Sequence, residues 1–157
     1  MLFPYAAATW AFGHAFLSFY RGSGGSAGLD TLSDSLEASA ANGDLGLFAL
    51  VWATGGLKVF AGLIPLALVR GSVPRVPRWM LLAATWLAGA ILLFYGLVNT
   101  TGLVIIELGW RDVPPDMGEQ AVRWGAFFWQ PLFALGGALF LAAAWQLQRR
   151  KRALALD

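Results

Sequence analysis

The sequence predicts an all-α fold: an integral membrane four-helix bundle with a short amphipathic helix in its first outer loop. Hydrophobic residues make up 58% of the chain and charged residues only 13%, whereas soluble domains carry about 25% charged residues. The apolar residues gather in four stretches, and an apolar helix of about 20 residues is long enough to cross a bilayer. Four spans and their loops use up all 157 residues, so we expect a single transmembrane domain over residues 1–157.

The first stretch, residues 2–20, is predicted to be a membrane-spanning helix. Pro4 suits its first turn, because the N–H group that proline lacks would have no helical partner there. A cleaved signal peptide is the alternative, since Ala6, Ala7 and Ala8 are small and lie near the N-terminus. The missing basic segment before them and the aromatic-rich continuation favour an uncleaved helix.

Residues 21–43 form a polar loop that opens with a Gly/Ser run. Within it Leu29, Leu32 and Leu36 recur at positions i, i+3 and i+7, which is the spacing of one helix face. Asp30 or Thr31 has the side chain of a helix N-cap. We therefore predict a short amphipathic helix on the membrane surface, which covers the bundle end or acts as a lid over a cavity.

The second stretch, residues 45–69, is predicted to span the membrane with a single charge, Lys58, near its middle. A charge at the centre of a membrane helix costs about 2.5–3.5 kcal/mol. Lys58 should therefore face other helices, water or a bound partner rather than lipid.

Two further spans follow. The third is predicted to begin at Trp79 and to end either at Val98, before a polar run, or at about residue 108. Residues 111–118 contain two consecutive prolines and are predicted to be a loop. The fourth span is predicted for residues 124–147.

Charge distribution predicts the orientation. Basic residues gather between the second and third spans and after the fourth span: Arg70, Arg75, Arg78, Arg149, Arg150, Lys151 and Arg152. The other two loops are mainly acidic. The positive-inside rule therefore predicts a multi-pass protein of the inner (plasma) membrane with both termini in the cytoplasm.

Several classes of chemistry are excluded by composition. The chain has no cysteine and one histidine, so disulfides, thiolate metal sites, iron–sulfur clusters and two-histidine haem ligation within one chain are ruled out. We expect no metal and no cofactor, since no carboxylates cluster at ligand spacing. Nucleic acid is not an expected partner, because the basic residues mark membrane boundaries rather than one polar face.

The candidate site is a polar layer in the outer half of the bundle. His14 and Gln130 each lie about six residues, or roughly 9 Å, below the outer end of their helices. Thr54 and Lys58 lie a turn or two deeper on one helix face, and Asn99 joins the layer if the third helix continues past Val98. Predicted ligand-binding residues are His14, Lys58, Gln130, Thr54 and Asn99, with Trp10, Trp52 and Trp129 as aromatic walls.

Two segments resemble a known family. GHAFLSFYRGSGG, residues 13–25, ends the first helix with a histidine and aromatics before a Gly-rich loop, and WQPLFALGG, residues 129–137, opens the last helix with aromatic-X-Pro-Leu. Both resemble a domain-of-unknown-function family of small four-helix bacterial membrane proteins. The third helix departs from that pattern, with Tyr95, Asn99 and Thr101 where an Arg and an Asp are expected. The resemblance implies a fold and no activity.

The leading functional hypothesis is a binding or accessory membrane protein. In it the polar layer holds an apolar ligand with a polar head, of lipid, prenyl or quinone type, in a cavity of the outer half. Lys58 would pair with an anionic or carbonyl group, and His14 and Gln130 would orient it. Membrane lipids are expected partners, together with a second copy of the chain or another membrane subunit.

Three alternatives stay open. A membrane-embedded enzyme would use His14 or Lys58 as acid or base, although no catalytic residue is assigned, because paired carboxylates and a nucleophile constellation are missing. A small transporter would have to be oligomeric, since four helices leave little room for a pathway. The polar layer could also be only interhelical hydrogen bonding, which contributes about 0.6 kcal/mol per contact.

Overall fold

The computed structural model describes residues 2–26, 28–29, 31–32, 34–71, 76–115 and 117–153. Within these ranges the regular elements are helices and no strand occurs, so the all-α prediction is confirmed. The elements are α1 (Leu2–Gly22), α2 (Asp34–Ala41), α3 (Leu45–Arg70), α4 (Arg78–Glu107), α5 (Glu119–Trp124), the π-helical segment Gly125–Trp129, and α6 (Gln130–Ala153).

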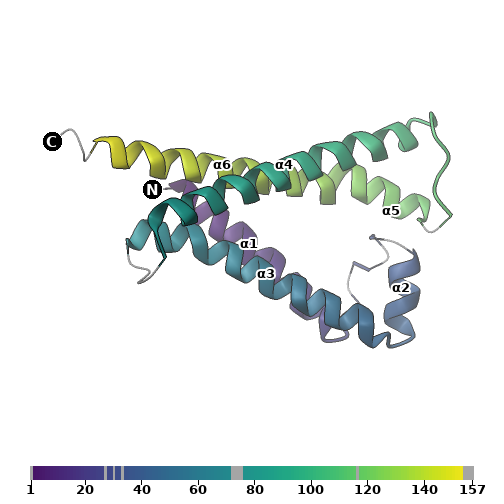
Figure 1. The fold of residues 1–157 in the computed structure, drawn as a ribbon. Coiled ribbons are helices and arrows are strands. Elements are labelled where there is room, and N and C mark those ends of the chain that lie inside the picture. Colours follow the sequence, from purple (N-terminus) through teal and green to yellow (C-terminus); the bar gives the residue numbers. More distant parts are fainter. Residues whose placement is uncertain are drawn as a thin grey trace.

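The long helices form two pairs that diverge like the arms of a V (Figure 1). One arm consists of α1 and α3, and the other of α4 with α5 and α6. The arms meet at the end where both chain termini lie, which we call the closed end. At the opposite end, which we call the open end, the arms are apart and α2 lies between them.

Three helices are long and apolar enough to cross a membrane by length and composition: α3, α4 and the continuous helix Glu119–Arg149. This search covers the described residues. The chain is therefore of membrane type. Whether α1, with its 21 residues, adds a fourth crossing stays a prediction.

Small residues hold the closed end together. A hydrophobic core forms where α1 and α6 meet, from Ala7, Ala11, Phe140 and Ala143. Between α4 and α6 the backbones approach so closely that a Cβ atom on Gly96 or Gly137 would overlap backbone atoms of the facing helix. Packing through small residues is how membrane helices associate, because burying apolar surface gives little gain in lipid.

The third long helix does not break at its polar run. It continues to Glu107, so the longer of the two predicted ends is the correct one. The side chains of Asn99, Thr100 and Thr101 each donate to the backbone carbonyl four residues earlier, at 2.8, 2.6 and 2.9 Å. Such bonds satisfy polar side chains on a helix without opening it. The helix ends at Glu107, and Gly109, two residues further on, has a φ of 74° that favours glycine.

The helix of the first loop is placed differently from the prediction. It begins at Asp34, so Leu29 and Leu32 precede it rather than lying on its face. The Thr31 hydroxyl donates to the Gly28 carbonyl at 2.7 Å and so does not cap the helix. Asp30 lies outside the described residues. Leu29 is nevertheless buried, at 8% exposure, because the turn folds it back between the arms.

A π-helical segment interrupts the fourth long helix at Gly125–Trp129. Pro131 explains it: proline has no N–H to donate to the carbonyl of Phe127, and its ring crowds that carbonyl. The helix widens just before the proline, and the Gln130 N–H bonds the Gly125 carbonyl five residues back. Such single-turn π segments are frequent at functional sites.

Candidate functional site

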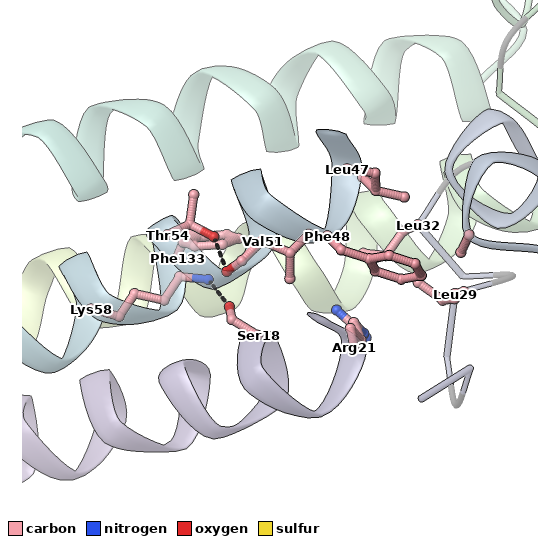
Figure 2. A pocket seen from close by; sticks show the side chains of 11 residues that line it. Ser18, Arg21, Leu29, Leu32, Leu47, Phe48, Val51, Thr54, Lys58 and Phe133 are labelled. Carbon is pink, nitrogen blue, oxygen red and sulfur yellow. Dashed lines mark hydrogen bonds between the residues drawn. The ribbon is translucent and has the colours of Figure 1, made fainter. Parts of the chain in front are cut away.

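A cavity of about 220 Å³ lies between α1, α3, α6 and the first loop, on the side of Lys58 that faces the open end (Figure 2). Its apolar lining comes mainly from the loop and the start of α3, and its polar groups from α1 and α3. The lining residues are Ser18, Arg21, Leu29, Leu32, Ala40, Leu47, Phe48, Val51, Thr54, Lys58 and Phe133. We call it the head cavity.

Lys58 is the central polar group of the head cavity. Its ammonium donates a hydrogen bond of 2.7 Å to the Ser18 hydroxyl on α1 (Figure 2). Ser18 is buried, at 6% exposure. Lys58 thus faces another helix, as expected from the cost of a charge in lipid. Because Ser18 is one helical turn beyond His14, the Lys58 ammonium lies one turn nearer the open end than His14, whereas Lys58 was expected from the sequence to lie deeper. The reason is that helical side chains lean toward the N-terminus of their helix, which on α3 is at the open end.

Arg21 forms the second polar group, at the end of α1. Its guanidinium lies over the Trp129 ring, 4.9 Å from the ring centroid, and its Nε is buried without a hydrogen-bond partner among the described residues. The Trp129 indole N–H in turn donates to the Thr31 hydroxyl at 3.0 Å. These contacts join the first loop, α1 and the π-helical segment beside the head cavity.

A second, larger cavity of about 450 Å³ adjoins the head cavity on the side of the closed end. It runs between α3 and α4, and its floor is formed by α1 and α6. Its lining residues are Trp10, Ala11, Thr54, Leu57, Lys58, Ala61, Ala84, Leu87, Ala88, Ile91, Leu92, Phe133 and Phe140. We call it the apolar groove. Thr54, Lys58 and Phe133 line both cavities.

His14 packs against the wall of the bundle instead of lining either cavity. Its Nδ1 lies 3.1 Å from the Trp10 carbonyl, and its ring stacks on Trp10 with centroids 4.1 Å apart. The Phe133 ring of α6, three residues beyond Gln130, lies 5.4 Å away. That His14 and Gln130 lie level stays a prediction. Nε2 is buried without a partner in the described residues, which leaves one ring nitrogen free to bond.

The other predicted residues divide between the cavities and the surrounding structure. Thr54 lines both cavities but donates to the Val51 carbonyl of its own helix at 2.9 Å. The amide oxygen of Gln130 is buried without a partner in the described residues. Asn99 bonds its own helix, and Trp52 donates to the Gly22 carbonyl at 2.9 Å, so the structure brings neither to the two cavities.

Of the three predicted aromatic walls, Trp10 lines the apolar groove, whereas Trp52 and Trp129 are not among the described residues that line the head cavity or the groove. The Trp10 indole N–H donates to the Leu132 carbonyl at 3.0 Å, and the face of the ring lies on Gly136, where a Cβ atom would overlap it. Trp52 packs on Phe19 and on Gly22 instead. Trp129 contacts Arg21 and the first loop, as described above.

The sequence interpretation overlooked Ser18, Arg21 and Phe133. A pattern for two of them was present: His14, Ser18 and Arg21 follow each other at i, i+4 and i+7, which places three polar residues on one face of an apolar helix. Arg21 was predicted to lie in the polar loop of residues 21–43 rather than at the end of the first helix. Phe133 has no comparable sequence pattern, because the chain contains many aromatic residues and most of them are expected to pack between helices.

No metal site emerges from the geometry. Within the described residues, His, Asp and Glu side chains form no group of three that could hold a metal ion. The site is instead a cationic pocket that adjoins an apolar groove and shares three lining residues with it.

Fold and site together define a small all-helical protein of membrane type with a polar-to-apolar pair of cavities. Residues 11–140 match the family described as protein of unknown function DUF3995, and the chain belongs to that family. The match covers both segments in which the resemblance was recognised. No curated protein and no solved structure matches this chain.

Proposed function

We propose that this protein is a four-span inner-membrane protein that holds an apolar ligand with a polar head, in a binding or accessory role. The observation that carries the proposal is that the head cavity and the apolar groove share three lining residues. A molecule with a polar head and an apolar tail would place one part in each. Ligand sites are mostly apolar with a few placed polar groups, and span about 300–1,000 Å³.

The position of the groove supports entry from the membrane. It opens between α3 and α4, two of the helices that are long and apolar enough to span. A lipid-like molecule could therefore enter sideways without passing through water. The shared location of both chain termini at the closed end (Figure 1) favours an even number of crossings, and hence a membrane-spanning α1. The basic tail favours a cytoplasmic position for that end.

The alternative functions draw less support from the geometry. An enzyme that uses His14 would need it in contact with the ligand, but His14 is not among the residues that line these two cavities. A Lys58 base would have to give up its bond to Ser18. For transport, neither cavity connects the two ends of the molecule, since the closed end is filled by the core around Phe140.

Filling the apolar groove tests the proposal. Ala84 lines the groove, whereas its neighbour Ala83 is exposed on the outer face of α4. Native mass spectrometry of protein extracted directly from membranes should show a retained small molecule in the wild type. Ala84→Phe should reduce its occupancy about tenfold, which corresponds to about 1.4 kcal/mol, and Ala83→Phe should leave it unchanged. A wild-type spectrum without any retained molecule would refute the proposal.

A further inference from the structure

The head cavity carries two positive charges and no described negative one. Arg21 and Lys58 both line it, and its other described lining residues are uncharged. A charge in a low-dielectric site needs a partner of opposite sign or a strong set of hydrogen bonds. Lys58 has one such bond, to Ser18, and Arg21 has a cation–π contact with Trp129. Neither contact supplies negative charge.

Both cations keep unused donors. An ammonium group has three N–H donors, and the structure gives Lys58 one acceptor, the Ser18 hydroxyl. Within the part of the chain that the structure describes, the Nε donor of Arg21 is buried without a partner. A buried donor without an acceptor costs about 1–3 kcal/mol. The two side chains are therefore arranged as they would be around an acceptor group that the described residues do not provide.

Their spacing suits one small anion. Ser18, which holds the Lys58 ammonium, and Arg21 lie three residues apart on the same face of α1, where neighbouring positions are about 5–6 Å apart. In Figure 2 the side chains of Ser18 and Arg21 both come from α1 and lie to the left of Phe48 and Leu29. A phosphate or carboxylate has two or three oxygens and can therefore accept from an ammonium and a guanidinium at the same time.

We propose, on the basis of the ligand-holding function above, that the ligand is an anionic amphiphile: a phosphate or carboxylate head bound between Arg21 and Lys58, with its apolar chain in the groove toward Phe140. The groove gives this chain an almost entirely apolar lining from α1, α3, α4 and α6. The Arg21–Trp129–Thr31 contacts close the head cavity on the side of the first loop. Neutral heads of the quinone or alcohol type would leave both cations without a counter-charge.

A chain-matched series of probes tests the charge selection. Protein in nanodiscs of zwitterionic phosphatidylcholine is offered equimolar pairs of dodecyl phosphate, dodecanoate, dodecanol and dodecyltrimethylammonium, and bound amounts are read by native mass spectrometry. Both anions should exceed dodecanol at least about tenfold, a difference of about 1.4 kcal/mol, and the ammonium probe should bind least. Inorganic phosphate alone should be retained far less than dodecyl phosphate, because it lacks the chain.

Two variants and a control assign the effect to the cavity. Arg21→Gln and Lys58→Met should each reduce the preference for anions over dodecanol about tenfold. Arg123→Gln removes the same charge from an exposed arginine that pairs with Glu107 outside the cavity, and it should leave the preference unchanged. Unchanged binding of dodecanol by the Arg21 and Lys58 variants shows that they still fold and still accept the chain.

The outcomes separate this inference from the function on which it rests. Equal binding of dodecanol and dodecyl phosphate would overturn the anionic head while leaving ligand holding intact. Equal retention of inorganic phosphate and dodecyl phosphate would overturn the part played by the chain. If no probe binds at all, the proposed function itself fails.

Discussion

Replacing Lys58 by methionine should make the protein more stable while removing its ability to hold an anionic ligand. Methionine has a similar length and fills the same space without the charge. The substitution removes the 2.7 Å bond to the Ser18 hydroxyl and the second cation of the head cavity. Stability and ligand retention should therefore change in opposite directions, which a purely structural lysine would not produce.

The size of the effect follows from two opposing contributions. A charge at the centre of a membrane helix costs about 2.5–3.5 kcal/mol. The lost interhelical hydrogen bond contributes about 0.6 kcal/mol on average and at most about 1.7 kcal/mol. Because Lys58 is only partly buried and lines a cavity that admits water, the lower part of the charge cost applies. The ligand-free variant should gain about 1–2 kcal/mol in free energy of unfolding.

The measurement is reversible unfolding of ligand-free protein in bicelles, with Ser18→Ala as the partner variant. Ser18→Ala keeps the charge and removes the acceptor, so it should lower the free energy of unfolding by about 0.6–1.7 kcal/mol. In the double variant the effect of Ser18→Ala should nearly vanish, because its bonding partner is gone. A loss of stability in Lys58→Met would refute the reasoning, since it would mean that the ammonium makes contacts stronger than its desolvation cost.

Two further predictions concern the fold around the site. Gly137→Ala would place a Cβ against the backbone of Leu93 and should lower the free energy of unfolding by about 1–3 kcal/mol. The control is Gly102→Ala, which faces open space and should be neutral or stabilising. Equal effects of the two substitutions would contradict the close approach of α4 and α6. Trp129→Phe removes the donor to Thr31, worth about 0.5–1.5 kcal/mol, and should speed amide exchange around Thr31 about two- to tenfold. Trp124→Phe should not, and unchanged exchange in Trp129→Phe would count against that contact.

The fold class and most helix bounds follow from composition and hydropathy. α3 was predicted to within one residue, because Asp44 caps its start, with bonds to the N–H groups of Gly46 and Leu47, and its apolar run ends at Arg70. The end of α4 could not be settled from sequence. Asn and Thr favour helix ends when their side chains bond the backbone locally, yet the same side chains can bond back to carbonyls within a helix. Only the tertiary position of residues 99–101 decides between these.

The candidate site was predicted less completely than the fold. Hydropathy identified Lys58, because a charge in an apolar helix stands out, and the structure places its ammonium in the head cavity. Depth counting failed for the ammonium itself, since it measures Cα positions and a lysine side chain reaches roughly a helical turn beyond its Cα. It also could not distinguish Thr54, which lines both cavities, from Asn99, which lines neither, although both side chains bond their own helix.

The antiparallel arrangement of α1 and α3 explains why two cations from different depths meet in one cavity. Side chains on a helix lean toward its N-terminus. Arg21 comes from the last turn of α1 and lines the cavity near the open end. On α3 the direction of lean points to the open end, so Lys58 leans outward from the middle of its helix and reaches Ser18. If α3 ran parallel to α1, the same lysine would lean toward the core around Phe140, where its charge would have no polar partner. The cationic pocket is therefore a consequence of helix direction as much as of residue type.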